Sequence, residues 1–436
     1  MSIFKNIQYF SSKAYSMTKN IVVAIKRVKE KLWFRPLVFC ILSIIGALIA
    51  QLADSTILHE LVPEIKTESL SELLNNISAS MLVISIFAVG SMISAFSAAS
   101  NTATPRSFQL TIADDVSKNA LSVFIGSFIY SIVALVALKN GYYGRAGHFV
   151  LFVFTLLFFA LVIITFLRWV DRISKLGRMG HTIKLVEDAT AKAIRYRLQY
   201  PTLKGLNIVP NQKRGVPIYS TKIGYVQLIN MQKLQAIAKK LDILITLNAV
   251  PGTFIALDIP LFYVGIENKD YVIDEYYELR TAFTLGDMRY FEEDPRFGLI
   301  TLSEIASRAL SPAVNDPGTA IQIISSHIRL FSLYNNSQGG EELQEEIYTR
   351  IAVPQLAITD LFEDAFRPIA RDGAANIEVM IRLQKAFRSI SKINHNDMTA
   401  VAMTHSLQAF SRAEKIMAYK EDIIELKNKS IFNTIP

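Results

Sequence analysis

The chain has 436 residues, of which 51% are hydrophobic and 19% are charged. A soluble domain usually has about 25% charged residues, so this composition argues against an ordinary soluble protein. The single cysteine, Cys40, excludes a disulfide framework and a cysteine-based zinc site. The net charge of +8 is concentrated in residues 1–36, which contain eight Lys or Arg and one acid. A basic segment directly before an apolar run indicates an anionic lipid surface as its partner.

Residues 1–32 have an apolar residue at every third or fourth position, with lysines between them. This spacing predicts a basic amphipathic helix, which we place within residues 1–36. Such a helix can lie in the headgroup layer, where its lysines meet anionic inner-leaflet lipids. The alternative is a helix that docks on the soluble half of the chain. We favour the membrane-surface helix because its polar face is cationic.

Four stretches are long and apolar enough to cross a bilayer, which takes about 17–25 residues. They contain no Asp, Glu, Lys or Arg and cover residues 37–53, 77–100, 120–138 and 149–167. Buried helices of a soluble protein do not give so many uncharged runs in close succession. The sequence therefore predicts an all-α transmembrane bundle of four spans at residues 37–169.

The orientation of the bundle follows from the Lys and Arg residues that flank the spans. With the N-terminus inside, the inner segments hold fifteen of them and the outer loops hold three. Lys and Arg accumulate in cytoplasmic segments, so both chain termini are expected in the cytoplasm.

The second predicted span carries two neighbouring rows of small residues. Spaced four residues apart, they are Gly90, Ser94, Ala98 and Thr102 in the first row and Ser91, Ala95, Ala99 and Ala103 in the second. Small residues let helices approach closely in lipid, so helix packing explains either row alone. The functional interpretation is a pore, in which the first row contacts a neighbouring copy and the second faces the axis. The candidate pore-lining or helix-packing residues are Gly90, Ser91, Ser94, Ala95, Ala98, Asn101 and Thr102.

From residue 170 onward no run reaches spanning length, and the composition becomes that of a soluble domain. A helical extension and a linker rich in Pro and Gly are expected at residues 170–204. Short alternating runs predict a small β-rich module at residues 205–267. Helical periodicity then predicts a helical cytosolic domain at residues 268–436. The expected fold class is the transmembrane bundle followed by a cytosolic α+β region.

The segment 308–320 predicts an elbow between two helices. Ser311-Pro312 ends the first helix, Asn315 or Asp316 caps the second, and Pro317 occupies its first position, where a missing N–H costs nothing. This mechanical explanation is sufficient for the motif. The residues of the structural elbow are Arg308, Ser311, Pro312, Asn315, Asp316, Pro317 and Thr319.

Several segments together resemble a bacterial family of predicted integral membrane proteins of unknown function. They are Leu-Ser-Pro-Ala-Val-Asn-Asp-Pro-Gly-Thr-Ala at 310–320, Glu-Asp-Pro-Arg-Phe-Gly at 293–298, Gly-Tyr-Val-Gln at 224–227, Val-Pro-Gly-Thr-Phe at 250–254, Thr-Pro-Arg at 104–106 and Gly-Ser-Phe-Ile-Tyr at 126–130. The resemblance covers residues 35–420. It implies four N-terminal spans, a soluble C-terminal half and the bacterial inner membrane, and it implies no activity.

Signals for catalysis or cofactor binding are weak throughout the chain. No HExxH, GxSxG, GxGxxG or P-loop motif occurs, and the six histidines are scattered. Asp360, Glu363 and Asp364 share one helix face, which is more typical of a solvated acidic stripe than of a metal site. We expect no enzymatic activity, no cofactor, no metal and no nucleic-acid partner.

Two functional hypotheses from different classes remain. The first is a homo-oligomeric channel or pore-like protein with a cytosolic assembly or gating domain. The second is a membrane-anchored scaffold or sensor whose cytosolic helices bind a partner protein. A polar face of the second span that is turned to a water-filled axis favours the channel. The same face buried within one chain, with an exposed apolar patch on the cytosolic half, favours the scaffold.

Overall fold

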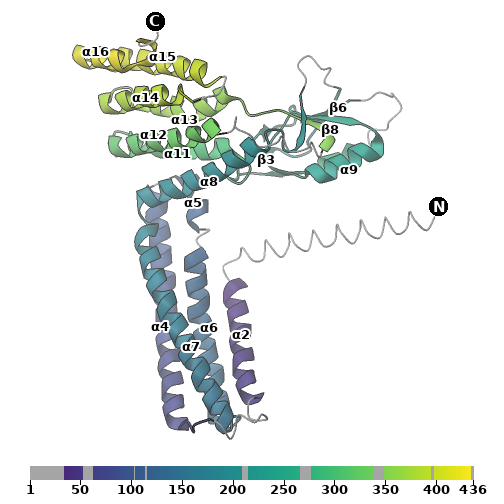
Figure 1. Ribbon diagram of the computed structural model, residues 1–436, viewed down its shortest axis with the longest axis vertical. Helices are drawn as coiled ribbons and strands as arrows, with labels where there is room; N and C mark the ends of the chain where they lie inside the picture. The colour runs from purple at the N-terminus through teal and green to yellow at the C-terminus, as the bar shows by residue number, and fades with distance from the viewer. Residues whose placement is uncertain are drawn as a thin grey trace, which may run out of the picture. The chain divides into compact units, whose positions relative to one another are not determined.

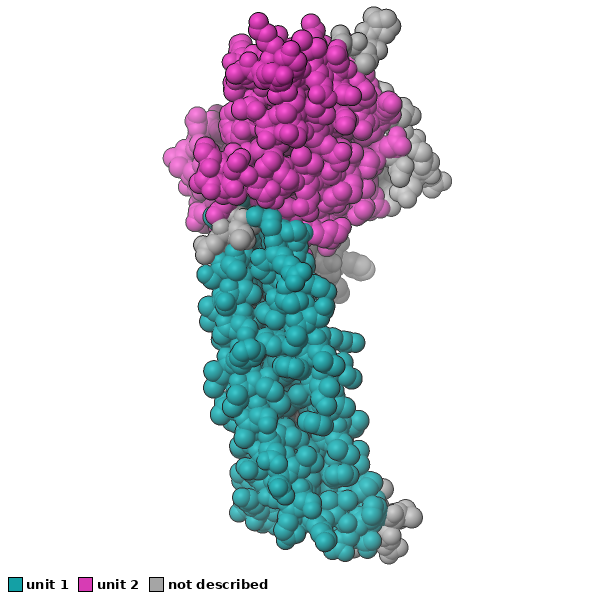
Figure 2. All heavy atoms as spheres, turned by 90° about the vertical axis from the view of Figure 1, so that its left-hand side faces the viewer, with its two compact units in different colours: residues 1–182 teal, residues 183–436 magenta. Residues whose placement is uncertain are grey.

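The computed structural model describes residues 34–52, 62–102, 104–112, 115–208, 215–265, 276–336, 348–393 and 397–433. The chain divides into two compact units, residues 1–182 and 183–436, which we call unit 1 and unit 2 (Figure 2). The amphipathic helix expected within residues 1–36 lies almost wholly outside the described residues.

Unit 1 is built from long helices (Figure 1). They are α2 (Phe34–Leu52), α4 (Thr67–Thr102), α5 (Pro105–Ile112), α6 (Asp115–Lys139) and α7 (Arg145–Leu176). Within the described residues, three helices are long and apolar enough to cross a membrane, over Thr67–Ala99, Asp115–Lys139 and Arg145–Leu176. These three contain the second, third and fourth predicted spans. The first predicted span falls on α2, so four spans are not confirmed and the first one stays a prediction.

Helix α4 is longer than the sequence suggested. It begins at Thr67, ahead of the expected start at residue 77, and has 36 residues. At 1.5 Å per residue its length is about 54 Å, well beyond the ~30 Å of a hydrocarbon core. The extra turns include Glu68 and Glu72, whose charges mark this end of the helix as lying outside the apolar layer.

Helix α6 occupies the middle of unit 1. Its apolar stretch is 56% buried, compared with 22% for α4 and 17% for α7. Small polar residues on α6, among them Ser127 and Ser131, are buried and permit close helix packing. The Tyr130 ring stacks on Phe158 with centroids 4.4 Å apart, and its hydroxyl lies 3.1 Å from the Thr155 hydroxyl.

Helix α8 (Met179–Gln199) begins in the last residues of unit 1 and continues in unit 2, which then forms two sheets. Its strands are β1 (Gly205–Asn207), β2 (Val216–Tyr219), β3 (Gly224–Ile229), β4 (Leu244–Leu247), β5 (Phe254–Ile255), β6 (Pro260–Gly265), β7 (Phe283–Gly286) and β8 (Tyr348–Val353). One sheet has the order β1-β8-β4-β6-β2 and the other the order β5-β3-β7. Helix α9 (Met231–Leu241) shares with the strands a core that includes Leu234, Ile245 and Phe262, and the short helix α10 (Tyr276–Arg280) precedes β7.

The β-rich part of unit 2 extends beyond the expected boundary at residue 267. Strand β8 lies between β1 and β4 and is parallel to both, and β7 pairs with β3. Both strands fall in segments for which helical periodicity was expected. Each is only four to six residues long, so pairing with distant strands decides its conformation against the local pattern.

The rest of unit 2 is a stack of three helix pairs. The pairs are α11 (Pro295–Ala309) with α12 (Pro317–Ser332), α13 (Ile358–Asp372) with α14 (Ile377–Ile390), and α15 (Met398–Ile416) with α16 (Lys420–Lys429). Helices α11, α13 and α15 pack in one layer, and α12, α14 and α16 pack in a second (Figure 1). The 3-10 turns η3 (Leu333–Asn336) and η4 (Ile431–Asn433) follow α12 and α16. Buried Phe331, Phe362, Phe366 and Phe387 form the aromatic centre between the layers.

Candidate functional site

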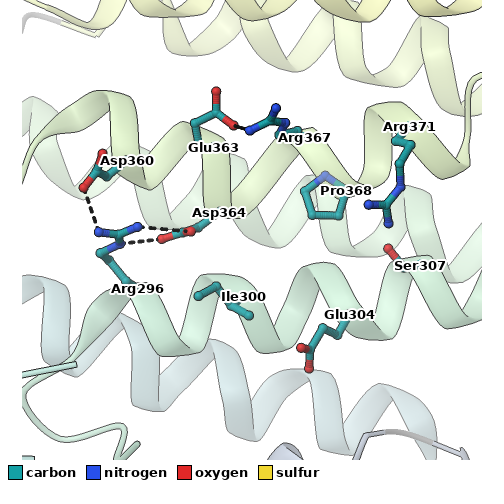
Figure 3. A pocket seen from close by; sticks show the side chains of 10 residues that line it. All are labelled: Arg296, Ile300, Glu304, Ser307, Asp360, Glu363, Asp364, Arg367, Pro368 and Arg371. Carbon is teal, nitrogen blue, oxygen red and sulfur yellow. Dashed lines mark hydrogen bonds and ion pairs between the residues drawn. The ribbon is translucent and has the colours of Figure 1, made fainter. Parts of the chain in front are cut away.

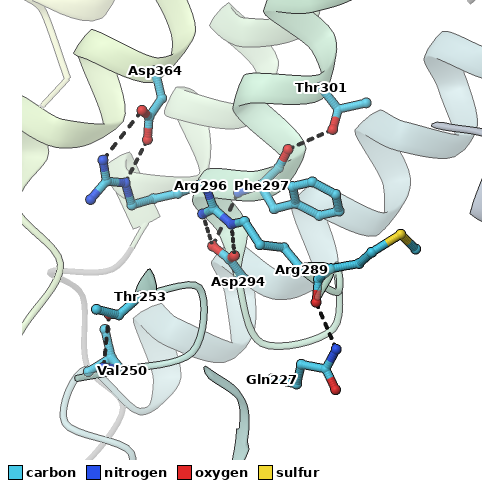
Figure 4. Close-up of polar contacts among 10 residues, drawn as sticks. Gln227, Val250, Thr253, Arg289, Asp294, Arg296, Phe297, Thr301 and Asp364 are labelled. Carbon is cyan, nitrogen blue, oxygen red and sulfur yellow. Dashed lines mark hydrogen bonds and ion pairs between the residues drawn. The ribbon is translucent and has the colours of Figure 1, made fainter. Parts of the chain in front are cut away.

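Three of the motif segments of the sequence meet around Asp294 (Figure 4). The turn that contains residues 250–254 is held to β3 because Val226 N–H donates to the Thr253 carbonyl at 2.9 Å and Gly252 N–H donates to the Val226 carbonyl at 2.8 Å. The side chain of Gln227 donates to the Met288 carbonyl at 2.7 Å. Segments 224–227, 250–254 and 293–298 therefore form one site, although they are far apart in the chain.

Asp294 is the centre of this site. Its carboxylate is the N-cap of α11 and accepts from Phe297 N–H at 3.1 Å. The same carboxylate accepts two hydrogen bonds from Arg289, at 2.6 Å from Nε and 2.8 Å from Nη2. Its side chain is only 4% exposed. Gly252 lies directly against it with a φ of +92°, and a Cβ atom there would collide with the carboxylate. Residue 252 must therefore be glycine, because a side chain would collide with Asp294 and because only glycine adopts this φ without strain.

A second ion-pair group adjoins the first at the start of α11. Arg296 donates from Nε to Asp364 Oδ2 at 2.6 Å and from Nη1 to Asp360 Oδ2 at 2.7 Å. Both carboxylates lie on α13, so Arg296 connects α11 with α13. Burial raises the pKa of Asp364 above its ordinary value, while the bonds from Arg296 act in the opposite direction. The predicted acidic stripe of Asp360, Glu363 and Asp364 is therefore partly an ion-pair surface between helices.

Pro368 explains how a buried serine and histidine support Asp364. A proline within a helix has no N–H for the carbonyl four residues earlier, which here belongs to Asp364. The Ser303 hydroxyl lies 2.8 Å from that carbonyl and 2.7 Å from the Ala365 carbonyl. Because carbonyl oxygens only accept, Ser303 donates to them, and His327 Nε2, at 3.3 Å, is the donor to Ser303. His327 is fully buried and neutral, since burial lowers its pKa to about 3.

A groove of about 600 Å³ runs between α11 and α13 beside these residues (Figure 3). Its arginines all have carboxylate partners, with Arg367 bonded to Glu363 at 2.8 Å and Arg371 bonded to Asp372 at 2.6 Å. The arginine charges along the groove are therefore balanced by intrahelical and interhelical pairs. Among the described residues, no group of three or more His, Cys, Asp or Glu is placed to hold a metal ion.

Arg197 lies near Asp294 at the end of α8. It is 5% exposed, and neither of its Nη atoms has a hydrogen-bond partner within the described chain. Burial lowers the pKa of Arg197, and the nearby Glu293 carboxylate opposes that effect. Burial also raises the pKa of Glu293. The two groups are thus a partly buried pair of opposite charges, held apart beside the Asp294 site.

The elbow residues lie at the surface of unit 2, between α11 and α12. Asp316 is the N-cap of α12 and accepts from Thr319 N–H at 3.0 Å, and Pro317 is in the first turn of the helix. Asn315 adopts a left-handed conformation with φ of +49°, and Ser311 donates to the Arg308 carbonyl at 2.7 Å. Pro312 is exposed. The geometry is that of a capped helix–turn–helix.

The two small rows of α4 face different surroundings within unit 1. Gly90, Ser94 and Ala98 are exposed, and a Cβ atom at Gly90 would meet nothing within 4 Å. Ser91 and Ala95 are half-buried. Ala99 is 3% exposed, so the second row, which we expected at an open axis, turns into the unit. Asn101 and Thr102 belong to the last turn of α4, and their side chains lie outside the description.

One local pattern in the sequence marks Asp294 as a helix cap. Asp294-Pro295 begins α11 just as Asp316-Pro317 begins α12, so both are a capping aspartate followed by a proline in the first turn. Arg289, Ser303 and His327 carry no such signal, because their partners come from other segments.

Comparison with known proteins places the chain in a family. The family model described as "Predicted membrane protein (DUF2254)" matches residues 29–389. The chain belongs to the DUF2254 family. This confirms the resemblance to a membrane-protein family that the motif segments indicated. The matched range includes the apolar helices, both sheets, the Asp294 site and the elbow of this DUF2254 protein, and it ends within α14.

Similarity to individual curated proteins is confined to a short segment. Uncharacterized proteins of Mycobacterium bovis and Mycobacterium tuberculosis are 55% identical to this chain over 40 residues. The match spans 9% of this chain and about 8% of the length of those relatives. No solved structure matches the chain.

Proposed function

We propose that this DUF2254 protein is a homo-oligomeric membrane channel in which copies of α4 line the path. Unit 2 then lies in the cytoplasm and assembles or gates the channel. The family description and the three apolar helices support the membrane setting. The proposal assigns no chemical reaction, cofactor, metal or nucleic acid to the chain.

The observation that supports the proposal most directly is a change in residue type along the exposed side of α4, from large apolar residues to small ones. Up to residue 93 this side presents large apolar residues, 40–67% exposed, namely Leu82, Val83, Ile86, Phe87, Val89 and Ile93. Beyond Ile93 its exposed residues are Ser94, Ser97 and Ala98. Lipid tails favour large apolar side chains, whereas small and hydroxyl-bearing residues favour contact with another helix or with water.

A path lined by these residues would be made of hydroxyl groups rather than charges. Residues 77–100 contain no Asp, Glu, Lys or Arg, so one chain alone offers little to a hydrated ion. Repetition of α4 around an axis would turn Ser94 and Ser97 into rings of hydroxyls, with Asn101 and Thr102 one turn further on. Because Ala99 is buried within unit 1, we assign the path to the first row and its neighbours, and the second row to packing inside the unit.

The test compares one substitution at two exposed small residues of unit 1. Ser94→Leu puts a large apolar side chain on the surface where copies of α4 are proposed to meet around the path, and Ala160→Leu, on the exposed face of α7 among large apolar residues, is the matched control. We expect Ser94→Leu to reduce the oligomer mass in native membranes and ion flux in liposomes, and Ala160→Leu to change neither. Equal behaviour of the two variants, or a wild-type protein that is monomeric in membranes, would exclude the channel.

The proposed orientation places both termini and unit 2 in the cytoplasm of a bacterium, with the chain crossing the inner membrane several times. Its basis is the asymmetry of Lys and Arg around the spans, and residues 1–36 are proposed to contact anionic lipids of the inner leaflet. In a Cys40→Ser background, an impermeant thiol reagent added to intact cells should label Ser69→Cys and leave Thr404→Cys unlabelled. The reverse labelling would refute the orientation.

The scaffold or sensor function is the second candidate, and an exposed apolar surface on unit 2 favours it. Near the β5-β3-β7 sheet, six large apolar residues are 47–58% exposed, namely Ile223, Leu228, Phe254, Leu257, Met288 and Tyr290. Large apolar side chains left exposed in one region of a fold are typical of a protein interface. If the scaffold function is correct, Phe254→Ser abolishes in-cell crosslinking to another protein and Ser94→Leu leaves it unchanged.

A further inference from the structure

Helix α8 has one continuous buried face over the part that belongs to unit 2. Its members recur every three or four residues and are 0–6% exposed, namely Ile183, Val186, Glu187, Thr190, Ile194 and Arg197. Two of them, Glu187 and Arg197, carry a charge, and a buried charge without a partner is costly. The contacts of Thr190, Glu187 and Arg197 therefore show how α8 is held.

Thr190 fixes the distance between α8 and α11. Its side chain lies directly against Gly298, and a Cβ atom at residue 298 would be 2.7 Å from the Thr190 Cβ. Rotation of the Thr190 side chain does not move its Cβ atom. The two helix backbones therefore approach this closely only because residue 298 is glycine. Any larger residue at position 298 must move one of the helices.

Glu187 fixes the direction in which α8 meets α12. Its carboxylate accepts two hydrogen bonds from Arg329, at 2.7 Å from Nε and 2.6 Å from Nη2. A bidentate pair of this kind sets the orientation of both groups as well as their separation. The Glu187 side chain is 8% exposed and that of Arg329 is 57% exposed, so a substitution of Arg329 leaves no cavity in the core.

The junction between α7 and α8 lies beside the proposed path. Helix α7 ends at Leu176 and α8 begins at Met179, with Gly177 as the C-cap of α7. A Cβ atom at Gly177 would lie 3.4 Å from the Ala98 Cβ, which is ordinary van der Waals contact. Ala98 belongs to the exposed row of α4 that we assign to the path. Within unit 1, the junction therefore touches the end of the path-lining row.

Arg197 indicates that α8 has a second arrangement. It is 5% exposed, yet neither of its Nη atoms has a hydrogen-bond partner within the described chain. The Glu293 carboxylate acts on it as an opposite charge nearby. A displacement of α8 that brings these two groups into contact would give the buried guanidinium a partner. The arrangement shown therefore satisfies Glu187 and leaves Arg197 unsatisfied.

We propose that α8 transmits displacements of α11 and α12 to the path-lining row of α4. The contacts of its buried face make α8 follow these two helices of unit 2, and α8 is continuous across the boundary between the units. Its movement displaces Gly177 and, through it, Ala98. In the arrangement shown Arg197 has no partner, and in the second arrangement it bonds to Glu293. Coupling between distant sites requires an element with two discrete arrangements, and α8 is that element.

This inference deepens the proposed function and rests on it only for its purpose, because it names how unit 2 controls the path. The contacts of α8 need neither a second copy of the chain nor a permeant ion. A test that measures the position of the α7–α8 junction therefore succeeds or fails independently of ion flux.

The experiment follows a disulfide between α4 and the junction, in the full-length protein in native membranes. The protein carries Ala98→Cys and Gly177→Cys in a Cys40→Ser background. The 3.4 Å between the two Cβ positions is close to the Cβ separation of about 3.5–4.5 Å in a disulfide, so mild oxidation should join them within one chain. Gly177 has a φ of −85°, which any residue adopts. Absence of the disulfide within one chain overturns the proposal.

Two variants displace α8 within unit 2, and a third is the control. Gly298→Ala forces α8 and α11 apart, and Arg329→Gln removes the partner of Glu187. Each should slow formation of the disulfide about threefold or more, because a displacement of about 1 Å takes the sulfur atoms out of bonding geometry. Gly265→Ala, where a Cβ atom makes only an ordinary contact of 3.6 Å, should leave the rate unchanged. Unchanged rates in both variants, or equal slowing by the control, overturn the proposal.

Two double variants separate displacement of α8 from general damage to unit 2. Thr190→Gly with Gly298→Ala restores the space between the helices and should recover most of the rate. Arg197→Met added to Arg329→Gln removes the charge that favours the second arrangement, and it should also recover most of the rate. Recovery by a second substitution is not expected of a misfolded protein. If either double variant stays as slow as its single variant, the proposal is overturned.

Ion flux in liposomes separates this inference from the channel. Flux is measured on Gly298→Ala and Gly265→Ala in the Cys40→Ser background, with α4 unchanged. A changed flux in Gly298→Ala alone, together with the slowed disulfide, supports both proposals. A slowed disulfide in a protein without any flux supports the movement of the junction and refutes the channel. Flux that depends on Ser94 but is equal in both glycine variants overturns the coupling and leaves the channel intact.

Discussion

Replacing Asp294 by alanine tests whether the network at the start of α11 holds unit 2 together. The substitution leaves Arg289, whose side chain is 15% exposed, without its two hydrogen bonds to a carboxylate. Removal of one partner from a buried ion pair costs about 3–5 kcal/mol. Part of this cost overlaps with loss of the α11 N-cap, which alone is worth about 1 kcal/mol. We therefore expect Asp294→Ala to destabilise unit 2 by about 4 kcal/mol.

Two further variants make the reasoning sharp. Asp294→Asn keeps a good capping residue and removes the charge, so it should cost about 1 kcal/mol less than the alanine variant. Asp188→Ala removes an exposed pair with Lys184, in which both side chains are more than half exposed, and should cost less than about 1 kcal/mol. Pulse proteolysis in urea, applied to the detergent-solubilised protein and read on fragments of unit 2, measures all three.

The result that would refute the reasoning is an Asp294→Ala protein within 1 kcal/mol of Asp188→Ala. Arg289 would then be solvated or bonded elsewhere, and the meeting of the three motif segments would not depend on the carboxylate. Unchanged stability together with lost ion flux would instead make Asp294 a functional residue.

Substitutions at three other residues of unit 2, each compared with a control or a related protein, have definite expected outcomes. Gly252→Ala should lower the urea midpoint strongly, because it forces a Cβ atom onto Asp294 and strains a φ of +92°. Gly265→Ala, at the end of β6, is the control and should not, because a Cβ atom there makes only an ordinary contact of 3.6 Å with Leu244. Asp316→Ala should cost about 1 kcal/mol through loss of a helix cap and Asp316→Asn much less, and lost flux at full stability would contradict this structural role. His327→Gln should make the stability of unit 2 less sensitive to acid. The pKa of His327 is 6.5 in the unfolded chain and about 3 in the folded one, so the unfolded state binds the proton first as pH falls. The free energy of unfolding therefore decreases between these values, by about 2 kcal/mol at pH 5. Equal pH slopes for wild type and His327→Gln, measured from pH 7 to pH 5, would show that His327 is not the cause.

The apolar helices were predictable because a run of about 20 residues without Asp, Glu, Lys or Arg is a strong local signal. The three long apolar helices α4, α6 and α7 contain predicted spans. What the pattern could not give was the start of α4, since the turns from Thr67 to residue 76 contain Glu68 and Glu72 and resemble a loop in hydropathy. Helix ends outside the apolar layer are set by capping and packing rather than by hydropathy.

The strands of unit 2 likewise fall into those that the local sequence predicted and those that it did not. Those between residues 205 and 265 were anticipated because turns punctuate them, whereas β7 and β8 were expected to be helical. Strand β8 gains its partners from β1 and β4, each about 100 residues or more away in the chain. No window of local sequence contains that information, so short strands in the middle of a sheet are the elements that periodicity loses first.

The motif segments of the Asp294 site could be recognised in the sequence, but their contact in space could not. The segments at 224–227, 250–254 and 293–298 were recognisable one by one, and their common purpose appears only when Gly252 is seen against the carboxylate of Asp294. The elbow, in contrast, was readable because cap, proline and turn are neighbours in the chain.

Pro368 makes a last connection between the core and the surface of unit 2. Because this proline leaves the Asp364 carbonyl without its helical donor, Ser303 supplies one, and His327 in turn donates to Ser303. The backbone that is repaired in this way carries the Asp364 side chain, which holds Arg296 at the start of α11. Arg296 follows Asp294 by two residues in the first turn of α11. The ion pair of Asp294 with Arg289 and the ion pair of Arg296 with Asp364 therefore both depend on the position of this turn. A change at Ser303 in the core should therefore be felt at the Asp294 site through backbone position alone, without any altered charge.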